Sequence, residues 1–256
     1  MFRCGLTGGI IAAQTQDRLE GLSTWWSVLF EAHGSSPELA RAAQERLLER
    51  YGPAIRRYLL AAVSDAHAAD DLFGEFGLRL VRGDFRQARP ELGRFRHLLK
   101  VALYRMVIDH QRRQAHWPQL LTAEPADDPP EPFADSDRVF RAEWRAQLFE
   151  TAWAALRAEE ERSGRPLYTL LRYRTDHPEV RAAEIAVRLI DWLGPDADAE
   201  WVRRRLFDAR RRFTDALVAE TARSLHPPTP NSLAEELTEL ELFDYCRDAL
   251  ARWSGR

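Results

Sequence analysis

Three carboxylates within six residues are the first candidates for chemistry in this sequence. Asp70, Asp71 and Glu75 occur in the stretch 67–76. If that stretch is a helix, Asp71 and Glu75 project from the same face, because residues four apart lie one above the other. Such carboxylates can hold Mg²⁺ around a diphosphate, provided that a second acidic cluster faces them across a cavity. The best partner, residues 215–220, lacks the intervening ligands.

The same stretch has apolar residues beside its carboxylates. Leu72, Phe73, Phe76 and Leu80 recur at helical spacing. Apolar anchors bordered by charge are typical of a helix face that docks on another protein. A solvated acidic face on an ordinary helix has the same composition, so spacing alone does not distinguish it from a docking face. Either interpretation is favoured over a metal site, because no second acidic cluster is found.

A second segment, residues 94–116, is strongly basic. It has six basic residues against the single acidic Asp109, and the aromatic Phe95 and Tyr104 lie between the cations. The six are Arg94, Arg96, Lys100, Arg105, Arg112 and Arg113. Cations that bind phosphates, interleaved with rings that stack on bases, are typical of a surface for single-stranded nucleic acid. An amphipathic helix with a basic outer face is the simpler alternative.

A third segment has the pattern of a helix-turn-helix. An amphipathic stretch at 181–193 is followed by a break at 194–198 and by the arginine-rich stretch 199–213. Arg203, Arg204 and Arg205 recur seven positions later as Arg210, Arg211 and Arg212. Seven residues are about two helical turns, so the two triplets share faces. The pattern predicts a recognition helix for the major groove, although helix pairs joined by a turn occur in many α proteins.

The elements that position these residues are all expected to be helices, because convincing alternation of period two is absent. The expected helices span 22–32, 37–60, 66–82, 94–115, 138–162, 166–174, 180–192, 198–225 and a region near 232–252. Ser36 followed by Pro37, and Asp198, are the predicted helix starts.

Residues 117–137 are predicted to be a linker. They include five prolines and six acidic residues and no basic residue, a composition that buries little and resists regular structure. The chain therefore divides into an extension (1–22), a helical domain (23–116), the linker, a helix-turn-helix domain (138–225) and an acidic helical tail (226–256).

Composition narrows the class of protein further. Mean hydropathy is −0.46, and no apolar run is long enough for a membrane span or a secretory signal. The two cysteines, Cys4 and Cys246, are far apart and have no metal-ligand spacing. We therefore expect a cytoplasmic protein without a metal or other cofactor. A net charge of −3 does not indicate a nucleic-acid partner, but the clustering of the basic residues does.

In the acidic stretch, the basic stretch and the helix-turn-helix pattern, the chain resembles the extracytoplasmic-function sigma factors, in particular the planctomycete-like group. Residues 24–29 resemble the opening "TRWSVV" segment of that group, and residues 67–76 its "DAEDLTQEFF" helix. Residues 93–96 resemble the start of its "GRFRSFL" element, and residues 103–113 its "LRNFLIDHxRR" helix. Residues 182–221 are similar to the fourth conserved region. The resemblance covers about 23–225 and is strongest at 66–113.

The resemblance implies a role for each stretch. It implies that the acidic helix docks on core RNA polymerase through Asp70, Asp71, Leu72, Glu75 and Phe76. It implies that the basic stretch holds the melting −10 element of promoter DNA, through the six basic residues above with Phe95 and Tyr104. It also implies that a helix with Trp201 and five arginines reads the −35 element; these arginines are Arg203, Arg204, Arg205, Arg210 and Arg211. The polymerase performs the phosphoryl transfer, so no catalytic residue and no small-molecule substrate are expected. An anti-sigma factor is a further candidate partner.

The sequence departs from the family pattern at several positions. Gly74 stands where glutamine is common, at a cost of about 1 kcal/mol relative to alanine inside a helix. Arg105 and Tyr104 replace a common asparagine and arginine, which bears on base preference. The predicted turn is enlarged to 191–198, and Trp201 replaces a small residue. The main alternative is therefore a sigma-like helical interaction protein without promoter-specific reading.

Overall fold

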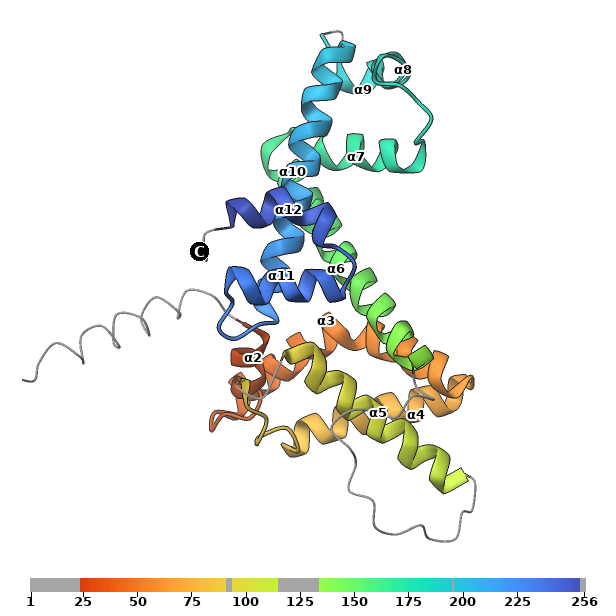
Figure 1. Ribbon diagram of the computed structural model, residues 1–256, viewed down its shortest axis with the longest axis vertical. Helices are drawn as coiled ribbons and strands as arrows, with labels where there is room; N and C mark the ends of the chain where they lie inside the picture. Colours follow the sequence, from red (N-terminus) through yellow and green to blue (C-terminus); the bar gives the residue numbers. More distant parts are fainter. Residues whose placement is uncertain (1–23, 91–93, 115–133, 195, 254–256) are drawn as a thin grey trace, which may run out of the picture. The chain divides into compact units, whose positions relative to one another are not determined.

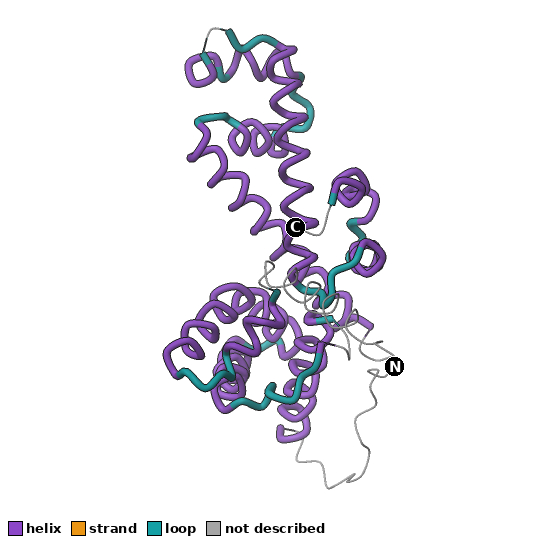
Figure 2. Tube along the Cα trace, turned by 90° about the vertical axis from the view of Figure 1, so that its left-hand side faces the viewer, coloured by secondary structure: helices purple, strands orange, loops and turns teal. Residues whose placement is uncertain are grey.

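The computed structural model describes residues 24–90, 94–114, 134–194 and 196–253, and within these ranges every regular element is a helix (Figure 2). The all-α prediction is confirmed for this part of the chain. Figure 1 labels the helices α2 (Trp25–Glu31), α3 (Pro37–Val63), α4 (Ala66–Arg82), α5 (Phe95–Gln114), α6 (Ala134–Ser163), α7 (Leu167–Asp176), α8 (Ala182–Arg188), α9 (Ile190–Leu193), α10 (Ala199–Arg223), α11 (Pro230–Glu239) and α12 (Phe243–Arg252). None of these helices is long and apolar enough to cross a membrane.

The chain divides into two compact units, which we describe separately. The first unit comprises α2 to α5 and the short segment Arg223–Pro228, and the second comprises the remaining described helices. The expected boundary falls in the linker, most of which lies outside the described residues, as does the extension before residue 24. At its C-terminal end the predicted linker is too long, because α6 already begins at Ala134.

Two predicted helices are each interrupted. The region 180–192 is divided at Leu189 into α8 and the short α9. The tail is divided between α11 and α12, where Glu241 has a left-handed φ of 58° and the Leu242 N–H donates back to the Leu237 carbonyl at 2.8 Å. That bond closes the end of α11 in the manner of a Schellman turn. No glycine or proline stands at either break, so the usual sequence signal is missing.

The first unit has an aromatic core contributed by α2, α3 and α5. The ring of Phe95 lies 5.8 Å from Trp26 and 5.5 Å from Tyr51, and Tyr51 meets Trp25 edge-on at 5.0 Å. Gly52 of α3 allows a close approach to α4, since a Cβ at this position would lie 3.2 Å from the Phe73 ring. These contacts fix α3, α4 and α5 against one another.

The segment Arg223–Pro228 completes the first unit. The guanidinium of Arg223 lies 4.7 Å from the centre of the Trp25 ring. The N–H of Phe95, the first residue of α5, donates to the Ser224 carbonyl at 3.1 Å. First-turn N–H groups have no partner within their own helix, so this segment caps α5 from outside. The domain boundary expected at 225 places these residues with the helix-turn-helix domain instead.

In the second unit, α6 and α10 pack through aromatic side chains. Phe213 of α10 lies 4.6 Å from Trp153 and 5.9 Å from Phe149, both on α6. The start of α7 is held to the end of α6, because the N–H and hydroxyl of Thr169 both donate to the Glu160 carboxylate at 2.9 and 2.6 Å. In both views, α8 and α9 lie beside the N-terminal end of α10 (Figures 1 and 2).

Residues 229–253 of the acidic tail are part of the second unit. Arg145 of α6 pairs with Glu241 at 2.6 Å, and Arg252 of α12 pairs with Asp215 of α10 at 2.7 Å. Tyr245 lies 6.5 Å from Phe149, and Cys246 is fully buried. Burial raises the pKa of the Cys246 thiol to about 12, so the thiol stays protonated and packs as a small apolar group.

Candidate functional site

The acidic helix α4 forms because its ends are capped and one stripe is apolar. The Asp65 carboxylate accepts a hydrogen bond from the Ala68 N–H at 2.9 Å, and Gly83 ends the helix with φ of 87°. Leu72, Phe76 and Leu80 form the buried stripe. The prediction that Leu72 and Phe76 contact a partner is therefore corrected, because both side chains face the core of their own unit.

A different apolar pair lies on the exposed face of α4. Leu78 is 55% exposed and Val81 is 59% exposed. They continue a stripe that begins at Asp71 and Gly74, with the spacing i, i+3, i+7 and i+10 of one helix face. Neither residue was among the predicted docking residues. The available signal was that they are apolar but fall outside the stripe of Leu72, Phe76 and Leu80.

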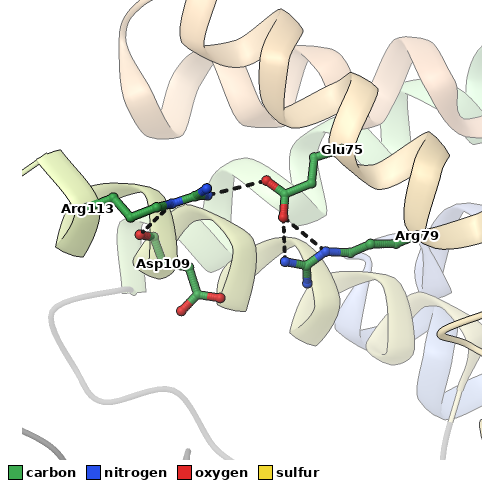
Figure 3. A network of polar contacts seen from close by, with 4 residues as sticks. All are labelled: Glu75, Arg79, Asp109 and Arg113. Carbon is green, nitrogen blue, oxygen red and sulfur yellow. Dashed lines mark hydrogen bonds and ion pairs between the residues drawn. The ribbon is translucent and has the colours of Figure 1, made fainter.

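Two of the predicted carboxylates are held by arginines. Asp70 pairs with Arg56 of α3 at 2.7 Å. Glu75 accepts from Arg79 at 2.5 and 3.1 Å and from Arg113 of α5 at 3.3 Å (Figure 3). Partial burial by itself raises the pKa of Glu75, but the hydrogen bonds and charges of Arg79 and Arg113 outweigh it, so this pKa lies below its usual value.

The network joins two predicted sites. Arg113, expected to bind DNA, also donates to the Asp109 carbonyl at 3.3 Å (Figure 3), so its guanidinium bridges α4 and its own helix. Asp71 remains exposed and is the predicted docking carboxylate that a partner can reach most freely. Among the described residues, no group of three or more His, Cys, Asp or Glu side chains is placed to hold a metal ion.

The basic helix α5 turns part of its predicted surface inward. Phe95 is only 1% exposed, and Arg96 is also buried. The prediction that these two side chains contact nucleic acid is corrected: Phe95 fills the aromatic core between Trp26 and Tyr51, where its ring cannot stack on a base.

The outer face of α5 keeps the other predicted residues. Arg105 and Arg112 are exposed, whereas Arg94, Lys100 and Tyr104 are half-buried. Partial burial raises the pKa of Tyr104, against the opposing charge of Arg112. The tyrosine therefore stays uncharged beside a cation, and the helix presents a mixed aromatic and basic surface.

The basic helix α10 begins at the predicted residue. The Asp198 carboxylate accepts from the Trp201 N–H at 2.7 Å, which confirms Asp198 as the helix cap. Val202, Leu206, Ala209 and Phe213 are buried. The opposite stripe is exposed throughout, at the spacing i, i+3, i+4, i+7, i+10 and i+11, and consists of Glu200, Arg203, Arg204, Phe207, Arg210 and Arg211. We call these six residues the basic stripe.

The arginines of α10 differ in their partners. Arg204, Arg205 and Arg211 lie 3.7 to 4.0 Å from carboxylates one turn away on the same helix. Arg205 also covers the Trp201 ring at 5.2 Å. Within the described part of the chain, Arg203 and Arg210 have no ion-pair partner. Exposed pairs of this length are weak, so the basic stripe stays largely available to an anionic partner.

A shallow groove runs along the first half of α10. Its volume is 570 Å³, and its lining includes Trp201, Arg203, Arg204 and Phe207. Phe207 is the residue that sequence analysis missed, although it lies outside the core stripe and between the two arginine triplets. Comparison with protein-family models, curated sequences and solved structures found no match for this chain.

Proposed function

We propose that this chain is a sigma-type factor that binds core RNA polymerase and directs it to promoter DNA. The observation that carries the proposal is the basic stripe of α10. Four exposed arginines share one face of a capped helix whose opposite face is buried. Such a helix, preceded by α8, α9 and a turn, suits the recognition helix of a helix-turn-helix.

The second part of the proposal assigns α4 to polymerase docking. Its exposed face combines the apolar Leu78 and Val81 with the carboxylate of Asp71. An apolar patch bordered by charge fits a helical partner with basic residues. The outer face of α5, with Arg105, Arg112 and Tyr104, supplies cations and a ring for the melted strand.

The test is transcription in vitro with the core polymerase of the same organism on a genomic library. We expect the chain to direct transcripts from a defined set of promoters. If the chain does not bind the polymerase, the proposal fails. If it binds the polymerase but yields no promoter-specific transcript, the proposal also fails, and an interaction protein without promoter reading replaces it.

A pair of charge reversals tests the docking face. Asp71→Lys places a cation on the exposed face of α4 and is expected to weaken polymerase binding by about tenfold or more, since like charges across an interface repel. Glu45→Lys reverses an exposed charge on α3 and serves as the matched control. Equal affinities for the two variants would remove α4 from the interface.

The alternative, an interaction protein without promoter reading, is favoured by one observation. Val187 of α8 and Ile190 and Trp192 of α9 are all exposed, which gives the stretch before α10 several apolar side chains at its surface. Large exposed apolar patches mark contacts with other proteins. Under this alternative Trp192→Ala weakens partner binding, whereas Arg203→Ala changes nothing.

A further inference from the structure

Phe207 is an aromatic residue that the fold does not use. Its side chain is 66% exposed, whereas Phe213 of the same helix is buried. Among the described residues, the Phe207 ring makes no aromatic or cation–π contact. A phenylalanine stabilises a fold by removing apolar area from water, and Phe207 removes little. Packing therefore gives no reason for a phenylalanine at this position.

The surroundings of Phe207 indicate what would cover it. Arg203, Arg204, Arg210 and Arg211 lie three or four residues away on either side, so all four flank the ring on the basic stripe. A protein partner would have to bring several carboxylates to surround an apolar centre. Duplex DNA offers this arrangement in every major groove, because phosphates border a floor on which the thymine 5-methyl is the apolar group.

Resting on the proposed function of α10, we propose that Phe207 contacts the 5-methyl group of a thymine in the major groove. The four arginines bind phosphates or guanine edges and supply affinity, while Phe207 distinguishes one base pair from the others. Trp201 is less suited to this role, because the Arg205 guanidinium lies over its ring at 5.2 Å and the side chain is half-buried.

The experiment replaces thymine by uracil, which lacks only the methyl group. A preferred duplex is first selected from a random pool with the full chain, alone and bound to core polymerase. Each thymine of that duplex is then changed singly to uracil. We expect one position at which uracil weakens wild-type binding by about fourfold, the effect of burying one methyl group.

The Phe207→Ala variant should bind the thymine and uracil duplexes equally well at that position. It should also keep the wild-type thermal unfolding midpoint, because most of the side chain is exposed to solvent. Leu39→Ala removes another exposed apolar side chain, 66% exposed and on α3, and should leave the discrimination unchanged.

Three results would overturn the inference and are distinguishable from one another. If no duplex is preferred over random DNA, both the proposed function of α10 and the role of Phe207 fail. If a duplex is preferred but no uracil substitution matters, or Phe207→Ala keeps the discrimination, only the role of Phe207 fails. If Phe207→Ala weakens polymerase binding and not DNA binding, the ring is a protein contact.

Discussion

The helices α4 and α10 are both amphipathic, capped by an aspartate and charged on the outside, but they use their charges differently. On α4, Asp70 and Glu75 pair with arginines of the neighbouring helices α3 and α5. On α10, Arg204, Arg205 and Arg211 pair only with weak partners on their own helix, and Arg203 and Arg210 have none within the described residues. Much of the charge on α4 therefore belongs to the fold, whereas the charge on the basic stripe of α10 is left for a ligand. Outside that stripe, α10 also pairs with other helices, through Arg212 with Glu159 and through Asp215 with Arg252.

The exposed apolar residues show the same contrast. On α4, Leu78 and Val81 share the exposed face with the carboxylate of Asp71, which suits a protein partner. On α10, Phe207 lies among arginines, which suits DNA. The most useful variants are those that separate residues serving the fold from residues serving a partner.

The largest effect is expected from Phe95→Ala. Phe95 was predicted to contact nucleic acid, but its ring is buried against Trp26 and Tyr51. Truncation to alanine therefore leaves a cavity, and we expect a loss of about 3–5 kcal/mol in the free energy of unfolding. Phe207→Ala should change it by less than about 0.5 kcal/mol. Urea denaturation measures both, and a small effect of Phe95→Ala would place this ring at the surface.

Arg203→Ala is expected to have the next largest effect, on DNA binding. Arg203 is exposed and has no ion-pair partner among the described residues. Its loss should therefore lower the slope of log affinity against log salt by roughly one, the contribution of one phosphate contact. Arg113→Ala should change the slope less, since Arg113 is already paired with Glu75. Fluorescence anisotropy over a salt series measures the slopes, and equal slopes for both variants would contradict the contrast between α4 and α10.

Gly74→Ala is expected to stabilise the free protein and weaken docking. A Cβ at Gly74 meets nothing within 4 Å, so alanine should raise the free energy of unfolding by about 1 kcal/mol through its helix propensity. The added methyl projects from the face of Leu78 and should hinder a partner at close range.

Gly77→Ala is the matched control for this prediction. A Cβ at Gly77 also meets nothing within 4 Å, but the residue lies at the edge of the exposed face. It should give the same stabilisation with less effect on docking. If Gly74→Ala leaves polymerase affinity unchanged, the partner does not approach α4 at this point.

The smallest effect is expected from Glu75→Gln. The folded-state pKa of Glu75 is lowered from 4.5, so its charge stabilises the fold above that pH, and this contribution is lost as the pH falls through the folded-state pKa. At neutral pH the variant should be less stable by under about 1 kcal/mol, because the carboxylate is partly solvated. Urea denaturation over a pH series should show the free energies of unfolding of the two proteins converging in acid. A difference that stays constant with pH would mean that the charge of Glu75 does not contribute to stability in this way.

Most helices could be predicted because their signals are local. The bounds of α4 match the predicted 66–82, since its aspartate cap, apolar period and final glycine all lie within one stretch of sequence. The same holds for the Asp198 cap and for the arginines of the basic stripe of α10. The breaks at Leu189 and Glu241 were missed, because packing and not a glycine or proline decides them.

The helical class, the caps and the charge of each helix face follow from local sequence, because these properties depend on neighbours within a few residues. Which side chains face outward depends instead on how the helices pack together. Phe95 and Leu72 are apolar residues at the right spacing for either a core or a docking face, and the choice depends on Trp26, Tyr51 and other residues far away in sequence. Likewise, Glu75 could be recognised as an acid on a helix, but its pairing with Arg113 exists only because α4 and α5 pack together.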